Sequence, residues 1–118
     1  MSSERDRLYL TEMLTAVYRI SMNLGDFTAD EWADIEPLVA VVCMNMIVLG
    51  EGANQLSSDL KDREPDVPWA DIIGMRNRLA HAYLRVNLHR VWEAATDTTP
   101  RLRAPLERLL GSLGPEPD

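Results

Sequence analysis

Hydrophobic residues recur every three or four positions along most of this chain, the spacing that places them on one face of an α-helix. The first such stripe lies within residues 5–24 and consists of Leu10, Met13, Leu14, Val17, Ile20 and Leu24. Gly25 and Asp26 follow it, and both residue types favour turns over helices. The pattern therefore predicts an amphipathic helix over residues 5–24.

A short helix is predicted next, ahead of a longer and more apolar one. Thr28 and Glu31 have the spacing of a capping box, which predicts a short helix from there toward Glu36. Pro37 interrupts or restarts the pattern. Beyond it the chain is apolar on nearly every side and then amphipathic as far as Leu60. We expect a central helix here, because the run is too long for one strand and no second strand accompanies it.

Two glycines stand inside this central helix. A glycine in a helix interior costs about 1 kcal/mol relative to alanine. Gly50 and Gly52 therefore predict that another backbone packs closely against the helix at this point.

The polar stretch KDREPDVP, residues 61–68, is typical of a surface loop because it is charged and contains two prolines. Pro68 suits the first position of a third helix, and Trp69 is expected to dock the start of that helix into the core. The apolar positions of this helix are Ile72, Ile73, Met75 and Leu79.

The last third of the chain predicts one more main helix and a shorter final one. Asn87 is a favourable N-cap for a fourth helix. Thr99 and Pro100 are expected to cap and begin the final helix, which Gly111 would end. Residues 111–118 are predicted to be a frayed tail.

These elements predict a single all-α domain over residues 1–118, an up-and-down four-helix bundle with a short accessory C-terminal helix. A chain of 118 residues can bury about two-thirds of the surface that its unfolded form exposes. The lone Cys43 cannot form an internal disulfide. The nearly uncharged run 37–50 is shorter than the roughly 20 residues that span a bilayer, and the charged N-terminus has no apolar signal segment. We therefore expect a cytoplasmic protein with no membrane contact.

Charge is distributed unevenly along the chain. The formal net charge is −7, which disfavours a polyanionic partner. Residues 76–108 nevertheless hold seven arginines and only three acidic residues, a net charge of +4, so the rest of the chain carries −11. This asymmetry is compatible with an anion-binding face on an acidic protein, and equally with a solvated charged surface.

Four polar side chains gather within the segment GMRNRLAHAYLRVN, residues 74–87. On a helix, Arg76 and Tyr83 are seven positions apart and lie nearly in line, while Asn77 and His81 share the neighbouring face. Arg76 and His81 are about 140° apart around the axis, too far to pair but suitably placed to line two walls of a cleft. Spacing alone leaves two readings open: cations that stabilise a helix C-terminus, or a site.

The segment Arg76-x4-His81-x-Tyr83 resembles the motif of HEPN-domain ribonucleases, and specifically the HepT-like toxins of toxin–antitoxin pairs. The resemblance extends to GEGANQLS, to VPWADIIGMRNRLAHAYLRVNLHRVW and to the N-terminal RLYLTEML, which fall in the order of that family and cover nearly the whole chain. It implies a HEPN-like helical bundle that dimerises so that the motifs of both chains form one composite cleft. It also implies a metal-independent endoribonuclease without a cofactor, acting on tRNA or mRNA.

The resemblance assigns roles to individual residues. Arg76 would bind the scissile phosphate, and His81 would act as general base or acid, because its unperturbed pKa is near 6.5. Asn77 would orient His81 or the phosphate. Arg78 and Arg85, in the basic segment, are predicted to contact RNA. Attack by the 2′-hydroxyl would leave a 2′,3′-cyclic phosphate and a 5′-hydroxyl.

The family also implies a partner. In HepT-like pairs a small MNT-type nucleotidyltransferase, the antitoxin, silences the toxin by transferring AMP to the tyrosine that corresponds to Tyr83. This chain departs from the family at Ala82, where glycine is frequent, and at Met44, where arginine is frequent. His89 is expected to be a surface residue. The alternative function is a catalytically inactive HEPN bundle that serves as a binding partner of a nucleotidyltransferase.

Overall fold

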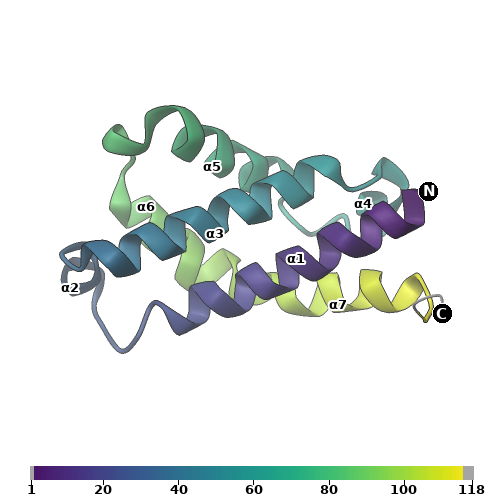
Figure 1. Ribbon diagram of the computed structural model, residues 1–118, viewed down its shortest axis with the longest axis horizontal. Coiled ribbons are helices and arrows are strands. Elements are labelled where there is room, and N and C mark those ends of the chain that lie inside the picture. The colour runs from purple at the N-terminus through teal and green to yellow at the C-terminus, as the bar shows by residue number, and fades with distance from the viewer. Residues whose placement is uncertain (1, 116–118) are drawn as a thin grey trace.

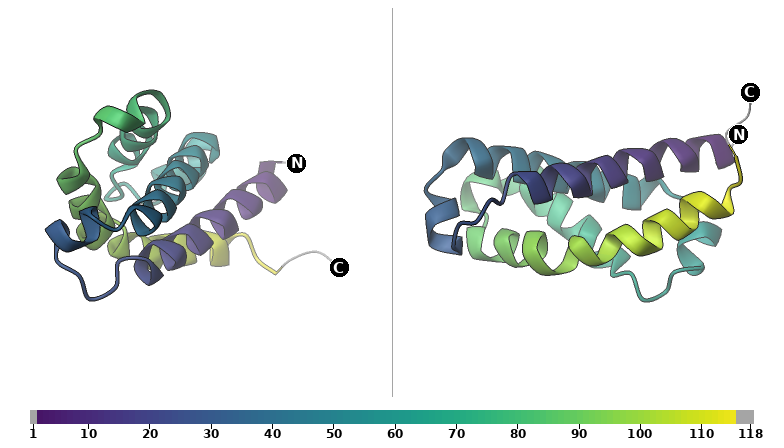
Figure 2. Two further views of the ribbon diagram at one scale, coloured as in Figure 1. Left: turned by 60° about the vertical axis from the view of Figure 1, so that its left-hand side comes forward. Right: turned by 90° about the horizontal axis from the view of Figure 1, so that it is seen from below.

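The computed structural model describes residues 2–115, which form a bundle of helices without a strand (Figure 1). Helix α3 (Glu36–Gln55) lies between α1 (Ser2–Met22) and α5 (Trp69–Ala82), and α7 (Arg103–Ser112) packs against α1 (Figure 2). The short helices α2 (Ala29–Ala33) and α4 (Ser58–Asp62) lie in the connections. The predicted all-α bundle is confirmed.

The fourth helical segment of the bundle, which we call its fourth arm, is longer than predicted. Helix α6 (Leu88–Glu93) continues through a π-helical turn, Ala94–Thr98, and a 3-10 turn, Pro100–Leu102, into α7. The predicted accessory helix is therefore the second half of this arm. Thr99 does not cap a helix: its backbone is helical, and its buried hydroxyl donates to the Ala94 carbonyl at 2.8 Å. The arm stays continuous because Leu102, Leu106 and Leu109 are all buried in the core.

The core runs the length of the bundle and is closed at one end by tryptophans. Its largest fully buried side chains include Leu10 and Met13 of α1 and Leu49 of α3. Trp32 of α2 is fully buried and packs on Trp92, with ring centroids 5.4 Å apart. Helix α3 is long and apolar enough to cross a membrane, but half of its most apolar stretch is buried in the bundle, as in a core helix.

The central helix ends earlier than its pattern predicts. Helicity stops at Gln55 and resumes at Ser58, whereas the periodicity continues to Leu60. The Asp6 carboxylate, buried on α1, accepts hydrogen bonds from the Ser57 backbone N–H at 2.9 Å and from the Ser57 hydroxyl at 2.8 Å. These long-range bonds hold Ser57 in an extended conformation and so break the helix.

Local capping signals are confirmed. Thr28 and Glu31 form the reciprocal capping box, and Asn87 accepts from the His89 backbone N–H at 2.9 Å. The Trp69 indole donates to the Glu64 carbonyl and anchors the start of α5.

The C-terminal segment is more ordered than predicted. Helix α7 passes through Gly111 to Ser112, and the Arg7 guanidinium donates to the Gly114 carbonyl at 3.0 Å. Within residues 111–114 the predicted fraying is thus not seen, and residues 116–118 of the predicted tail lie outside the described residues.

Candidate active site

Helices α3 and α5 approach most closely where Gly50 faces Arg76. A Cβ atom built on Gly50 would lie 2.0 Å from the Arg76 Cβ and 3.0 Å from the Ile72 carbonyl oxygen. Gly52 is equally crowded, by the Met13 side chain at 2.3 Å. The predicted close approach of another backbone is confirmed at Gly50, where it places the backbone of Arg76 firmly against α3, whereas Gly52 is crowded by a side chain and not by a backbone.

The Arg76 guanidinium is held from two sides. One terminal nitrogen, Nη2, donates to the Glu51 carboxylate at 3.0 Å, and the other, Nη1, donates to the Asn77 amide oxygen at 2.9 Å. The Arg76 side chain is 31% exposed, so one edge remains open to solvent. The Nε N–H of Arg76 is buried and has no hydrogen-bond partner within residues 2–115, whereas each terminal nitrogen keeps one N–H that no hydrogen bond uses. Arg76 therefore keeps donors for an anion.

His81 lies on the surface of α5, and no hydrogen bond of its imidazole is formed with residues 2–115. The structure thus joins Arg76 to Asn77 and leaves His81 free, as expected from the angle between Arg76 and His81 around the helix. The imidazole is open to a substrate or to a partner chain. The other histidine, His89, is also on the surface, with Nε2 3.4 Å from the Asp30 carboxylate.

Tyr83 is not where a continuous helix would place it. Helix α5 ends at Ala82, whose φ of −146° and ψ of 41° break the helical path, and Tyr83–Arg85 forms a 3-10 turn. The projection that stacks Tyr83 above Arg76 is therefore wrong. The break occurs at the position where the family often has glycine.

The surroundings of Tyr83 include charges from the N-terminal half of α3. Partial burial, together with the nearby Cys43 and Glu36, raises the pKa of Tyr83 above its usual value. Cys43 is eight residues before Glu51, which is about 12 Å along a helix axis. The residues of α3 that influence Tyr83 are thus remote from Glu51, which binds the Arg76 guanidinium.

An apolar face lies beside the motif. We define it by six residues that are exposed or half-buried: Val41, Met44, Ile47 and Val48 of α3, and Tyr83 and Leu84 of the turn after α5. Met44 is 60% exposed and Leu84 is 96% exposed. Large exposed apolar side chains gathered in this way typify an interaction surface. The α3 stripe leads directly to Glu51, the partner of Arg76.

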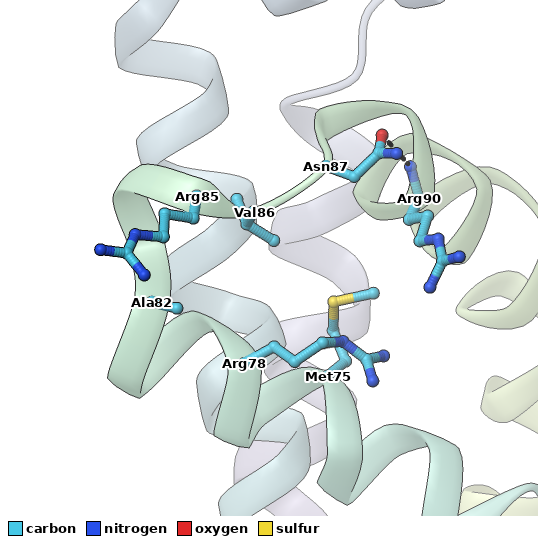
Figure 3. Close-up of a pocket in the computed structure, with 7 residues that line it drawn as sticks. All are labelled: Met75, Arg78, Ala82, Arg85, Val86, Asn87 and Arg90. Atoms are coloured by element: carbon cyan, nitrogen blue, oxygen red, sulfur yellow. Dashed lines mark hydrogen bonds between the residues drawn. The ribbon is translucent and has the colours of Figure 1, made fainter.

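Three arginines surround a pocket on the side of α5 that faces away from Arg76. The pocket encloses about 250 Å³, and its apolar lining comes from Met75, Ala82 and Val86 (Figure 3). Its arginines are Arg78, Arg85 and Arg90, which we call the arginine pocket together with that lining. The structure brings the two predicted RNA contacts, Arg78 and Arg85, to one pocket. Arg90 was missed by sequence reasoning, although its place in the basic segment was a signal.

A family model supplies the decisive comparison. The model described as Ribonuclease HepT-like matches residues 13–109, most of the chain. This chain belongs to the HepT-like ribonuclease family. The motif Arg76-x4-His81 and the helices that carry it fall within the matched residues.

Curated proteins agree with this membership. The chain is 24% identical over 101 residues to "Probable ribonuclease HepT" of Thermococcus cleftensis, covering 86% of this chain and 92% of that protein. It is 23% identical over 106 residues to "Putative RNase MJ1380" of Methanocaldococcus jannaschii, covering 89% and 97%. No solved structure matches significantly. The HepT-like relatives thus support a ribonuclease as the class of activity.

Proposed function

We propose that this HepT-like protein is a metal-independent endoribonuclease, the toxin of a toxin–antitoxin pair, whose active site is completed by a second copy of the chain. The observation that carries the proposal is that the motif on α5 combines a positioned arginine with a free histidine. Arg76 is positioned by Glu51, Asn77 and the Gly50 contact, while His81 is free on the same helix beside the apolar face.

The proposed chemistry needs only groups that the chain and the RNA supply. A histidine takes the proton of the 2′-hydroxyl, the 2′-oxygen attacks phosphorus, and the bond to the 5′-oxygen breaks as that oxygen receives a proton from an acid. Two copies of His81 across a dimer axis could divide these roles. Arg76 donates to the phosphate oxygens and stabilises the charge that builds up in the transition state.

The proposed dimer uses the apolar face. A two-fold interface brings the same patch of each chain together, so the motif beside the patch meets its own copy. We expect Met44→Glu to give a monomer in light scattering and to lose cleavage, because it places a charge in the interface. Met22, on α1, is 62% exposed compared with 60% for Met44, and Met22→Glu should remain dimeric. A dimeric and active Met44→Glu protein would refute this interface.

The proposed regulation is AMP transfer to Tyr83 by a nucleotidyltransferase antitoxin. The Tyr83 side chain is 43% exposed and therefore accessible to an enzyme. An added nucleotide would lie on the apolar face beside Glu36 and Cys43, where its bulk and negative charge would oppose dimerisation. This differs from direct competition for Arg76, which the break at Ala82 disfavours.

Mass spectrometry after co-expression with the cognate transferase tests this regulation. We expect the increment of one AMP, its loss in Tyr83→Phe, and its retention in Tyr18→Phe, since Tyr18 is exposed on α1. An unmodified wild-type protein in the presence of an active transferase would contradict the proposal.

The decisive test of catalysis is cleavage of RNA in excess chelator by protein made without its partner. General acid–base catalysis contributes about 10²–10⁴-fold, so His81→Ala should lose a factor of that order. The other histidine provides the control, because His89→Ala should cleave normally. Undiminished cleavage by His81→Ala would contradict the assigned role. Absence of cleavage by the unmodified dimer would favour the alternative, a binding partner of the transferase.

A further inference from the structure

The arginine pocket is built where three elements meet: the end of α5, the 3-10 turn after it and the start of α6 (Figure 3). Arg78 and Arg90 extend toward the same side of the pocket, whereas Arg85 stands on the opposite rim. The apolar lining separates the two groups. Positive charge and apolar surface are thus presented together in a space of about 250 Å³.

The charges of this pocket are uncompensated. Within residues 2–115, none of the guanidinium groups of Arg78, Arg85 and Arg90 forms an ion pair with a carboxylate, whereas Arg101 and Arg108 both do. Like charges brought together repel one another, and an anion relieves that repulsion. In a protein with a net charge of −7, a pocket of three unpaired arginines therefore favours an anionic ligand.

Asn87 adds a directional polar group to the same pocket. Its side-chain oxygen is used as the N-cap of α6, where it accepts from the backbone N–H groups of His89 and Arg90. The capping bonds fix the amide, and its NH₂ group forms no hydrogen bond with residues 2–115. A fixed donor beside apolar surface suits the edge of a nucleobase or a ribose hydroxyl.

We propose that the arginine pocket binds one unpaired nucleotide of the RNA, next to the cleaved bond. The phosphate contacts Arg78 and Arg90, the base covers the lining formed by Met75 and Val86, and Arg85 contacts the continuing strand. This inference rests on the proposed ribonuclease function and specifies its substrate: RNA that is single-stranded on the flank of the cleavage site. A paired base in a duplex stays in its stack and cannot enter a pocket of this size.

The position of the pocket on α5 supports this path for the strand. Arg78 is three residues before His81, so the two side chains are about 60° apart around the helix. Arg76 is about 140° from His81 on its other side. His81 thus lies between the Arg76 site and the arginine pocket. A strand whose cleaved phosphate binds Arg76 and His81 would bring a flanking nucleotide to Arg78.

Binding of a short single-stranded 2′-O-methyl oligonucleotide, measured by fluorescence anisotropy, tests the proposal without cleavage, because the probe has no free 2′-hydroxyl. We expect Arg78→Gln and Arg90→Gln each to weaken binding about tenfold, the loss of one hydrogen bond between charged groups. Each should also lower the slope of log affinity against log salt by about 0.7, the value for one phosphate contact on a single strand. Arg19 on α1 is exposed and outside the pocket, so Arg19→Gln is the matched control.

Several outcomes would refute the proposal that the arginine pocket binds a nucleotide of the RNA. Wild-type affinity and salt slope in the Arg78 and Arg90 variants would do so, as would failure of the wild-type protein to bind the oligonucleotide. A duplex probe that binds as tightly as the single strand would refute the unpaired nucleotide. If AMP alone occupies the pocket and a longer strand binds no more tightly, the site serves a free nucleotide instead.

The two proposals fail separately. His81→Ala should lose cleavage, yet Arg78→Gln and Arg90→Gln should weaken probe binding in the His81→Ala background as they do in the wild type, because His81 is outside the pocket. A protein that binds the probe through Arg78 and Arg90 but cleaves no RNA would leave the pocket standing and refute the ribonuclease. If cleavage requires His81 but probe binding does not change in Arg90→Gln, the ribonuclease proposal stands and the pocket proposal is refuted.

Discussion

The contact between Gly50 and Arg76 allows a quantitative test of how α3 positions the motif. In Gly50→Ala the added Cβ would lie 2.0 Å from the Arg76 Cβ, whereas carbon atoms in contact normally stand about 3.5–4.0 Å apart. The two atoms must therefore separate by about 1.5 Å or more. Both are fixed to helical backbone, so neither can rotate away, and the helices must move apart.

The free-energy cost of this overpacking can be isolated by comparing Gly50 with a second glycine. Gly74 is on α5, and a Cβ there would meet only the tip of the Arg78 side chain, at 3.7 Å. Replacing either glycine with alanine adds about 1 kcal/mol of helix propensity. Overpacking lowers the free energy of unfolding by about 1–3 kcal/mol, and only Gly50→Ala incurs it. The difference between the two variants isolates this packing cost.

Thermal unfolding followed by circular dichroism, at equal chain concentrations, measures that difference. At about 4 °C per kcal/mol for a domain of this size, Gly50→Ala should melt about 4–12 °C below Gly74→Ala. Cleavage should fall in Gly50→Ala, because Arg76 is displaced from Glu51, and should persist in Gly74→Ala. A Gly50→Ala protein that melts at or above Gly74→Ala would refute the close contact.

Three further predictions concern Glu51, Asp6 and Cys43. Glu51→Gln weakens the hold on Arg76 and should lower kcat about tenfold, while the half-exposed pair changes stability by no more than about 1 kcal/mol; an unchanged kcat would contradict the positioning role. Asp6→Ala leaves the Ser57 N–H and hydroxyl unpaired and should lower the free energy of urea unfolding by about 1–3 kcal/mol, more than Ser57→Ala does. Burial raises the pKa of Cys43 from 9.0 to about 11, so the unfolded chain ionises first and stability should fall as pH rises from about 9 to about 11. In urea titrations, Cys43→Ala should reduce this fall in the free energy of unfolding with pH. An unchanged fall would refute the assignment of the effect to Cys43.

Helix content and caps could be predicted from the sequence because they depend on neighbours within about four positions. The stripe from Leu10 to Ile20, the capping box of Thr28 and the N-cap Asn87 are all local signals, and the structure confirms them, although the first helix ends at Met22, two residues before the predicted end. The same holds for the motif, since Arg76 and His81 are fixed by one helix. Family membership rests on such local segments and covers residues 13–109.

Predictions failed where a contact from far along the chain decided the local backbone. Periodicity predicts a helix as far as Leu60 because it carries no sign of Asp6, which is 51 positions from Ser57. Thr99 directly before Pro100 predicts a helix cap, but burial against the core keeps the chain helical through Thr99.

By itself the sequence determined which residues are proposed to carry the chemistry: Arg76, Asn77, His81 and Tyr83, on one segment of a helical bundle. Only the tertiary structure decided what surrounds them. Glu51 is 25 positions from Arg76, and their ion pair exists because a glycine lets α3 and α5 approach closely. The break at Ala82 took Tyr83 off the helical path of α5, and the turn into α6 brought Arg90 to Arg78. Spacing describes one helix, whereas a site is formed between helices, and their packing depends on the whole core.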